Sequence, residues 1–124
     1  IKREAESKIR FLAGLPCFAR WNCTMIRSIS ITCRDVVFPA QTTIIEQSAP
    51  VSGLFFIVSG VALIFRALRG ESGCIHNVLV TRVSSGDVFG ESLILHDGDH
   101  TLSCVSVIAE TMLKAYRLDE IQIP

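Results

Sequence analysis

Residues 86–93 read GDVFGESL, and residues 99–103, a short distance further on, read DHTLS. Gly90 and Glu91 stand where a short helical turn is expected to begin. Peptide N–H groups at the start of a helix attract an anion, and a neighbouring carboxylate can accept hydrogen bonds from ribose hydroxyls. The small polar run at 99–103 then leads into a strand. This combination predicts a pocket for a sugar phosphate.

The chain before residue 34 has helical periodicity. Apolar residues recur every three or four positions among charged ones and predict a helix over residues 1–13, which Gly14 ends. A second helix is expected from Asn22, a favourable N-cap residue, to Ile31. Its predicted buried residues are Met25, Ile26 and Ile29.

After Cys33 the pattern changes to short runs rich in β-branched and aromatic residues, separated by glycine or proline. Such runs at this spacing are typical of a β-sandwich or barrel. The expected strands cover residues 36–38, 43–47, 54–58, 61–66, 75–83, 102–108 and 112–118. Gly60 and Gly86 lie in tight turns and are expected to need a positive φ.

The composition excludes several classes of function. The 124 residues suffice for one domain, and 12 basic residues balance 12 acidic ones, so a nucleic-acid-binding surface is not expected. The apolar run 51–67 is interrupted by polar residues too often to insert into a membrane. The abrupt ends suggest a segment of a longer protein, and other domains of that protein are expected partners.

The five cysteines are odd in number and include no C-x-x-C pair. This pattern favours neither a zinc cluster nor a disulfide framework. We expect free, buried thiols in a reducing compartment, and hence a cytoplasmic protein or the cytosolic part of a larger one.

Three separated segments together resemble the cyclic nucleotide-binding domain family. They are FLAGLPCF at residues 11–18, the stretch from 38 to 61 with its FIVSG turn, and GDVFGE at 86–91. They follow one another in the family's order and spacing over nearly the whole chain. The resemblance implies a mainly β fold with flanking α elements: an eight-stranded antiparallel, jelly-roll-like β-roll, with N-terminal helices, a short cassette helix and a truncated C-terminal helix.

The family likeness also predicts how the chain is divided. One cyclic nucleotide-binding-like domain is expected over residues 1–124, with N-terminal helices at 1–32 and the β-roll at 33–118. The phosphate-binding cassette is expected at 89–103, and residues 119–124 would begin a C-terminal helix that Asp119 could cap.

By resemblance, Glu91 accepts a hydrogen bond from the ribose 2′-hydroxyl, and peptide N–H groups from Gly90 onward contact sugar and phosphate. The ligand would be cAMP or cGMP, with no further cofactor and no metal. Thr101 follows His100 at a position where some cGMP-responsive relatives also carry threonine. The expected ligand-binding residues are Gly90, Glu91, Ser92, Leu93, His100, Thr101 and Leu102.

His100 stands where the family carries an arginine that pairs with the phosphate. A guanidinium is always charged and offers two parallel donors, whereas histidine is largely neutral near pH 7 and is shorter. Losing a charge-assisted contact costs about 1.5–3 kcal/mol. Two hypotheses therefore stay open: a regulatory, non-catalytic module that binds a cyclic nucleotide weakly, or a degenerate domain that serves for docking without a ligand.

Several other interpretations compete at single positions. Glu91 could simply cap its helical turn. His96 and His100 have a spacing that can bind a metal on a helix, but here they flank a turn, and Ser92 and Ser103 lie in no nucleophile motif. The helix at 1–13 could pack on the β-roll or on a preceding domain.

Three arginines lie outside the predicted cassette. Each is expected to be exposed, with the alternative that one of them reaches the pocket. They are Arg66, Arg69 and Arg82.

Overall fold

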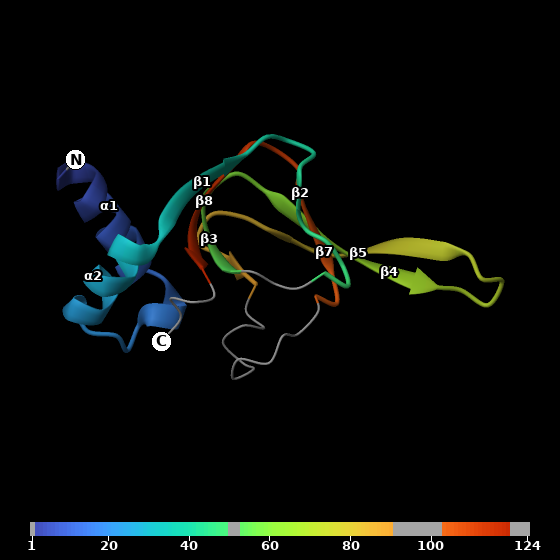
Figure 1. The fold of residues 1–124 in the computed structure, drawn as a ribbon, viewed down its shortest axis with the longest axis horizontal. Helices are drawn as coiled ribbons and strands as arrows, with labels where there is room; N and C mark the ends of the chain where they lie inside the picture. Colours follow the sequence, from blue (N-terminus) through green and yellow to red (C-terminus); the bar gives the residue numbers. More distant parts are fainter. Residues whose placement is uncertain (1, 50–52, 91–102, 120–124) are drawn as a thin grey trace.

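The computed structural model describes residues 2–49, 53–90 and 103–119. Helices gather at one end, the strands form a roll, and a long hairpin extends from the opposite side (Figure 1). The helical elements are α1 (Lys2–Ala13), the short 3₁₀ helix η1 (Pro16–Phe18) and α2 (Cys23–Thr32). The strands are β1 (Arg34–Phe38), β2 (Thr43–Ile45), β3 (Gly53–Ser59), β4 (Ala62–Arg69), β5 (Ile75–Val83), β6 (Val88–Phe89), β7 (Ser106–Ala109) and β8 (Leu113–Asp119).

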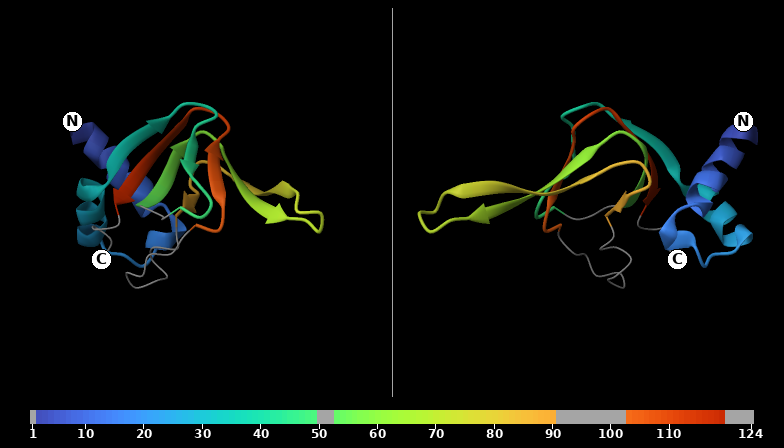
Figure 2. Two further views of the ribbon diagram at one scale, coloured as in Figure 1. Left: turned by 45° about the vertical axis from the view of Figure 1, so that its right-hand side comes forward. Right: turned by 180° about the vertical axis from the view of Figure 1, so that it is seen from behind.

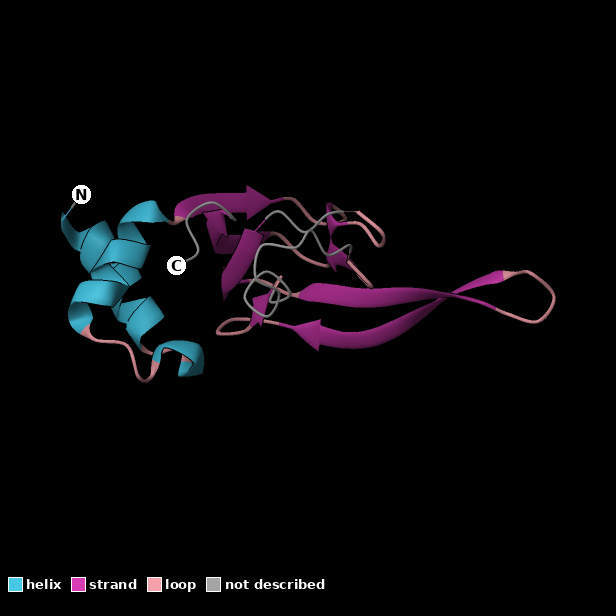
Figure 3. Ribbon diagram, turned by 60° about the horizontal axis from the view of Figure 1, so that its bottom comes forward, coloured by secondary structure: helices cyan, strands magenta, loops and turns pink. Residues whose placement is uncertain are grey.

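The strands form two antiparallel sheets of four strands each, in the orders β1-β8-β3-β6 and β2-β7-β4-β5. The predicted eight-stranded antiparallel β-roll is confirmed. The short cassette helix and the C-terminal helix fall on residues outside those that the structure describes. Figure 3 shows the helices at one end of the strands and the β4–β5 hairpin pointing the other way.

The two predicted helices are present. Asn22 is the N-cap of α2, and its Oδ1 accepts a hydrogen bond from the Met25 backbone N–H at 2.9 Å. Ile26 and Ile29 are buried as expected, but Met25 is 44% exposed, so that part of the prediction was wrong. Met25 lies about 40° around the helix from Ile29 and about 90° from the middle of the buried stripe of Ile26, Ile29 and Ser30, so it sits outside the edge of that stripe.

Helix α1 packs on the roll, which was one of the two predicted alternatives for this helix. Leu12 is fully buried in a cluster that includes Phe56 and Leu118 of the strands. Phe11 meets the Tyr116 ring edge-on, with ring centroids 5.6 Å apart. The Lys8 ammonium donates to the Cys33 carbonyl at 3.1 Å and lies 2.9 Å from the Asp35 carboxylate. These contacts fix the helix against the start of β1.

Strand β3 supplies residues to two separate cores. Leu54 and Phe56 join the cluster that the helices cover, whereas Phe55 and Ile57 join the cluster inside the roll. Successive side chains of a strand point to opposite faces, so a strand that is buried on both sides must be apolar at every position. The uninterrupted apolar run LFFIV at residues 54–58 is what a strand buried on both faces requires.

Strand β7 begins at Ser106, four residues after the predicted start at residue 102. The cause is local. The Ser103 hydroxyl donates to the Val105 carbonyl at 2.7 Å and accepts from the Val105 N–H at 3.3 Å. Such a side-chain turn offers the backbone an alternative to the sheet ladder.

The prediction of buried cysteines was wrong for three of the four thiols whose exposure is described. Cys23, Cys74 and Cys104 are exposed, and only Cys33 is buried. Cys23 opens α2 and Cys74 lies in the β4–β5 loop, both positions at the surface. Arg66, Arg69 and Arg82 are exposed as expected, with Arg82 Nε 3.3 Å from Glu110.

Burial gives Cys33 a measurable signature. Desolvation, reinforced by Asp35 and Asp119 and opposed by Lys8, raises the pKa of the Cys33 thiol from 9.0 to about 11. The unfolded thiol therefore loses its proton near pH 9 while the folded one keeps it, so the free energy of unfolding falls as pH rises between these values. Two pKa units correspond to about 2–3 kcal/mol.

We expect urea unfolding measured between pH 8 and pH 11 to show this loss as a difference between wild type and Cys33→Ala. The alanine variant starts less stable but loses less with rising pH. The raised pKa of Tyr116 is due mainly to desolvation, which both proteins share, with Cys33 the last of its causes. Cys23→Ala, which removes an exposed thiol, is the matched control and should run parallel to wild type. Parallel curves for Cys33→Ala would contradict the assignment.

Candidate functional site

A turn fixed to the middle of β3 leads into the predicted cassette. Ser84 N–H donates to the Asp87 carboxylate at 2.8 Å, which closes the turn. Gly86 N–H donates to the Ile57 carbonyl at 2.9 Å, and Ile57 N–H donates to the Asp87 carbonyl at 3.0 Å. Gly86 has a φ of +90° and Gly60 one of +99°, as predicted for both glycines. The Gly-Asp pair thus positions the next strand, β6, beside β3.

Gly90 lies against the backbone at the start of β3. It follows β6, whose two residues pair with Phe55 and Phe56, and it has a φ of +88°. A Cβ atom on Gly90 would collide with the carbonyl oxygen of Gly53, and one on Gly53 would come within 2.9 Å of the Leu118 carbonyl oxygen. Gly90 was predicted to contact sugar and phosphate through its peptide N–H group. The structure adds a reason for a glycine here that needs no ligand, namely close contact between two backbones.

The other end of the cassette is fixed by a reciprocal pair of backbone hydrogen bonds. Ser103 N–H donates to the Ala49 carbonyl at 2.9 Å, and Ser48 N–H donates to the Ser103 carbonyl at 2.7 Å. Ser103 is buried, and Ser48 has a φ of +72°. Both ends of the cassette are therefore held by the roll, at Gly53 and at residues 48–49.

Gln47 connects this end of the cassette to the β4–β5 hairpin. Its side-chain amide accepts from the Ala67 N–H at 2.7 Å and donates to the Ala67 carbonyl at 3.2 Å. Its backbone N–H donates to the Ser106 hydroxyl at 2.9 Å. The amide of Gln47 therefore takes the place of a neighbouring strand beside Ala67. The sequence analysis did not anticipate this role, because a glutamine at the end of a strand carries no pattern that predicts it.

Charged side chains near Gly53 form ion pairs with one another. Asp119 Oδ1 lies 3.0 Å from Arg34 Nη2 and 3.0 Å from Arg117 Nε, and the Arg117 guanidinium lies 5.5 Å from the centroid of the Phe55 ring. Asp119 was expected to cap a following helix, which falls outside the described residues. In the structure its carboxylate is the centre of an ion-pair group at the end of β8.

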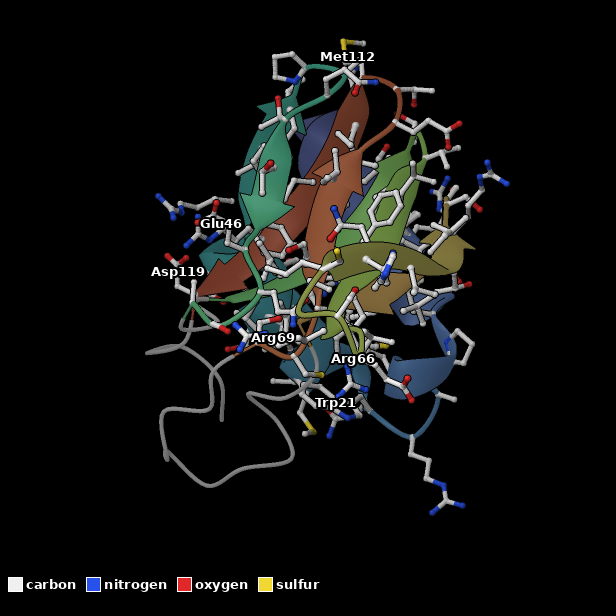
Figure 4. The ribbon with its side chains drawn as sticks, turned by 90° about the vertical axis from the view of Figure 1, so that its right-hand side faces the viewer. Trp21, Glu46, Arg66, Arg69, Met112 and Asp119 are labelled. Carbon is white, nitrogen blue, oxygen red and sulfur yellow. The ribbon has the colours of Figure 1, made fainter. Side chains whose placement is uncertain are left out.

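Of the seven residues predicted to bind the ligand, the structure describes Gly90. The other six, Glu91, Ser92, Leu93, His100, Thr101 and Leu102, lie outside the described residues, as does His96. Figure 4, seen from the side on which the β4–β5 hairpin projects, labels Arg66 and Arg69 below the middle of the view and Met112 at its top. Both arginines belong to β4, which extends away from the helical end that holds Trp21 (Figure 1). The alternative that one of these arginines reaches the pocket stays a prediction.

Two classes of site find no support in the described part of the chain. Over residues 2–49, 53–90 and 103–119, no group of three or more His, Cys, Asp or Glu side chains could hold a metal ion. Across the same ranges, no helix has the length and apolarity needed to cross a membrane.

The sequence model of the cyclic nucleotide-binding domain matches residues 35–123, which include most of the roll and the whole predicted cassette. The chain belongs to the cyclic nucleotide-binding domain family. No curated protein sequence matches the chain. The domains of this family are regulatory rather than catalytic.

Solved structures share this fold at low sequence identity. The regulatory domain of Toxoplasma gondii PKA with cAMP superimposes with a TM-score of 0.84 at 17% identity, over 97% of this chain and 44% of that one. The regulatory subunit of a cAMP-independent protein kinase A from Trypanosoma cruzi, bound to guanosine, gives 0.82 at 21%, over 96% and 40%.

A variant of the Trypanosoma brucei subunit of the same kind is similar too. It carries three substitutions, one of them threonine to arginine, and is bound to cAMP in its A site; the TM-score is 0.80 at 21% identity, over 96% of this chain and 41% of that one. The chain thus spans about two fifths of the length of these three proteins.

The contact between Gly90 and Gly53 can be tested by comparison with a second glycine. Gly86→Ala, where nothing lies within 4 Å of the new Cβ, should cost only the strain of a positive φ, about 1–2 kcal/mol. Gly90→Ala has a similar φ but must also separate two backbones, which we expect to cost about 1–3 kcal/mol more. Urea unfolding of both variants measures the difference. Equal losses would show that Gly53 imposes no constraint.

Proposed function

We propose that this chain is a non-catalytic regulatory module that binds a cyclic nucleotide, cAMP or cGMP, with weakened affinity. The observation that carries the proposal is the match of the family model over residues 35–123, which include Gly90 at the start of the cassette. Directly after Gly90 the sequence continues with Glu91 and Ser92, the carboxylate and the N–H donors that a ribose phosphate requires.

The fixed ends of the cassette support a binding role. Binding is stronger when the groups that contact a ligand are held in place beforehand, because less conformational entropy is lost. Gly90 is held by β3, and Ser103 is held by the backbone of residues 48–49. A cassette held at both ends can present its N–H groups to one phosphate position.

His100 limits the affinity in this proposal. A neutral imidazole offers one donor where a guanidinium offers a charged pair, and the deficit corresponds to about ten- to a hundredfold in the dissociation constant. Protonation restores a positive charge, and an ordinary imidazole is protonated below about pH 6.5. Binding through His100 should therefore strengthen as pH falls.

The second candidate is a degenerate domain that keeps the fold for docking and binds no nucleotide. His100 favours it, since the family's phosphate contact is lost. The two similar Trypanosoma subunits belong to cAMP-independent kinases, and one of them is bound to guanosine, which has no phosphate. The Toxoplasma gondii domain, by contrast, is bound to cAMP. Guanosine is therefore a useful third ligand, because a site without the phosphate contact can still bind the sugar through Glu91.

We expect calorimetric titration of the chain to detect weak binding of cAMP or cGMP that is tighter at about pH 6 than at about pH 7.5. His100→Arg should strengthen binding about ten- to a hundredfold and remove the pH dependence. The variant of the Trypanosoma brucei subunit with a new arginine, bound to cAMP, supports this direction of change.

The matched control is His76→Arg, which makes the same substitution at an exposed histidine of β5 and should leave affinity unchanged. No binding by wild type with binding restored in His100→Arg would mean a preserved pocket that has lost its ligand. Binding of guanosine, but of neither cyclic nucleotide, would show that the ligand of this domain is a nucleoside rather than a cyclic nucleotide. No binding of any ligand by either protein would overturn the proposal and leave the docking role.

A further inference from the structure

Strand β5 forms a long edge that projects from the roll. Among the described strands, β5 pairs with β4 alone. The two strands together extend well beyond the other strands in both views of Figure 2. Its nine residues, IHNVLVTRV, contain no proline, lysine or glycine. Edge strands are ordinarily short or carry such residues, which prevent pairing with another chain.

The hydrogen-bonding pattern shows which groups of β5 face outward. Ala67 gives both its N–H and its carbonyl to Gln47, so its backbone points away from β5. Ala67 lies opposite Asn77, and this pair is therefore one of the non-hydrogen-bonded pairs of the antiparallel ladder. It follows that the N–H and carbonyl of Asn77 point to the outer edge. Alternation places the same groups of Ile75 and Leu79 outward.

The side chains of residues 75–79 include no lysine, arginine or acidic residue, and Ile75, Val78 and Leu79 are apolar. Ile75 is 65% exposed and Leu79 is 42% exposed, and both lie on the face opposite to His76 and Val78. Between residues 75 and 79 there is no formal charge at neutral pH. The bulge of the hairpin lies beyond this stretch, toward the roll, where Phe65 pairs with Leu79 and Ile64 with Thr81.

We propose that this chain forms a symmetric dimer in which residues 75–79 of β5 pair antiparallel with the same residues of a second copy. With Asn77 on the two-fold axis, Ile75 of each copy lies opposite Leu79 of the other, and all outward backbone groups meet as hydrogen-bonded pairs. A two-fold axis requires one surface that complements itself, and this register provides it.

The charges of the hairpin fit a second copy. This register brings the loop that carries Glu71 beside the part of the other β5 that carries Arg82, whose exposed guanidinium also lies 3.3 Å from Glu110 of its own chain. Arg66 and Arg69 lie on β4, so three strand spacings, about 14 Å, separate the two copies' β4 strands. That distance exceeds the screening length of about 8 Å at physiological salt, so their repulsion is small.

Sedimentation velocity of the chain from about 5 to about 500 µM should show a rise from one to two chains. Asn77→Pro should weaken this association about tenfold or more, because it removes the outward N–H of each copy and no bond to β4. Ile75→Lys, which places a charge on the edge, should act in the same direction. Ile31→Lys, at an apolar residue of α2 that is 83% exposed, is the matched control and should leave association unchanged.

Cross-linking tests the register independently of stability. In a background with the exposed Cys23, Cys74 and Cys104 changed to serine, Asn77→Cys should form a disulfide-linked dimer under mild oxidation. The expected Cα separation of about 5.5 Å lies within the range a disulfide spans. Ile75→Cys should not cross-link, since the two copies would lie about 13 Å apart along the strand.

A wild-type chain that stays monomeric at every concentration would overturn the proposal, as would dimers that Asn77→Pro leaves intact. Cross-linking at residue 75 but not at residue 77 would overturn the register. A strand from a different protein would then be the remaining occupant of the edge.

Discussion

The burial of β3 on both faces is the constraint on which the other elements depend. Its residues alternate between a core that the helices cover and a core inside the roll, so neither layer can move without the other. Phe56 contacts the Phe18 ring on one side, with centroids 5.3 Å apart, and Phe55 contacts the Phe89 ring on the other at 4.8 Å. Close-packed interiors transmit displacement rather than absorb it. The position of β3 thus fixes both the helices and the start of the cassette.

At the start of β3, three backbone segments lie close together. Gly53 contacts Gly90 on one side and lies beside Leu118 of β8 on the other, and neither contact leaves room for a side chain. The chain therefore enters the cassette and leaves β8 at nearly the same point. The backbones of Gly90 and Leu118 share a single stretch of β3, which explains why glycine is needed at both residue 53 and residue 90.

Much of the fold was predictable from the sequence because its signals are local. A cap such as Asn22, turn glycines such as Gly60 and Gly86, and a run such as LFFIV each act within a few residues. Contacts between distant residues gave no such signal. Gly53 requires a glycine at residue 90, and the Gln47 side chain substitutes for a strand beside Ala67. No residue close in sequence to Gly53 or Gln47 predicts either contact. The prediction of buried cysteines was wrong for a related reason, because the burial of a side chain depends on its position in the fold rather than on its residue type alone. Of the predicted ligand-binding residues, Gly90 is the one that lies among the described residues, so only its predicted and observed geometry can be set side by side.

The hairpin and the cassette are joined by one continuous row of hydrogen bonds and strand pairs. Ser103 is bonded to residues 48–49, Gln47 is bonded to Ala67, and Ala67 lies opposite Asn77. A dimer axis at Asn77 would extend this row into the second copy and fix the two cassettes relative to each other. Cooperativity requires an element with two arrangements that a ligand distinguishes. In the proposed dimer this row would set the distance and orientation of the two copies, and coupling between them would require a further element with two arrangements.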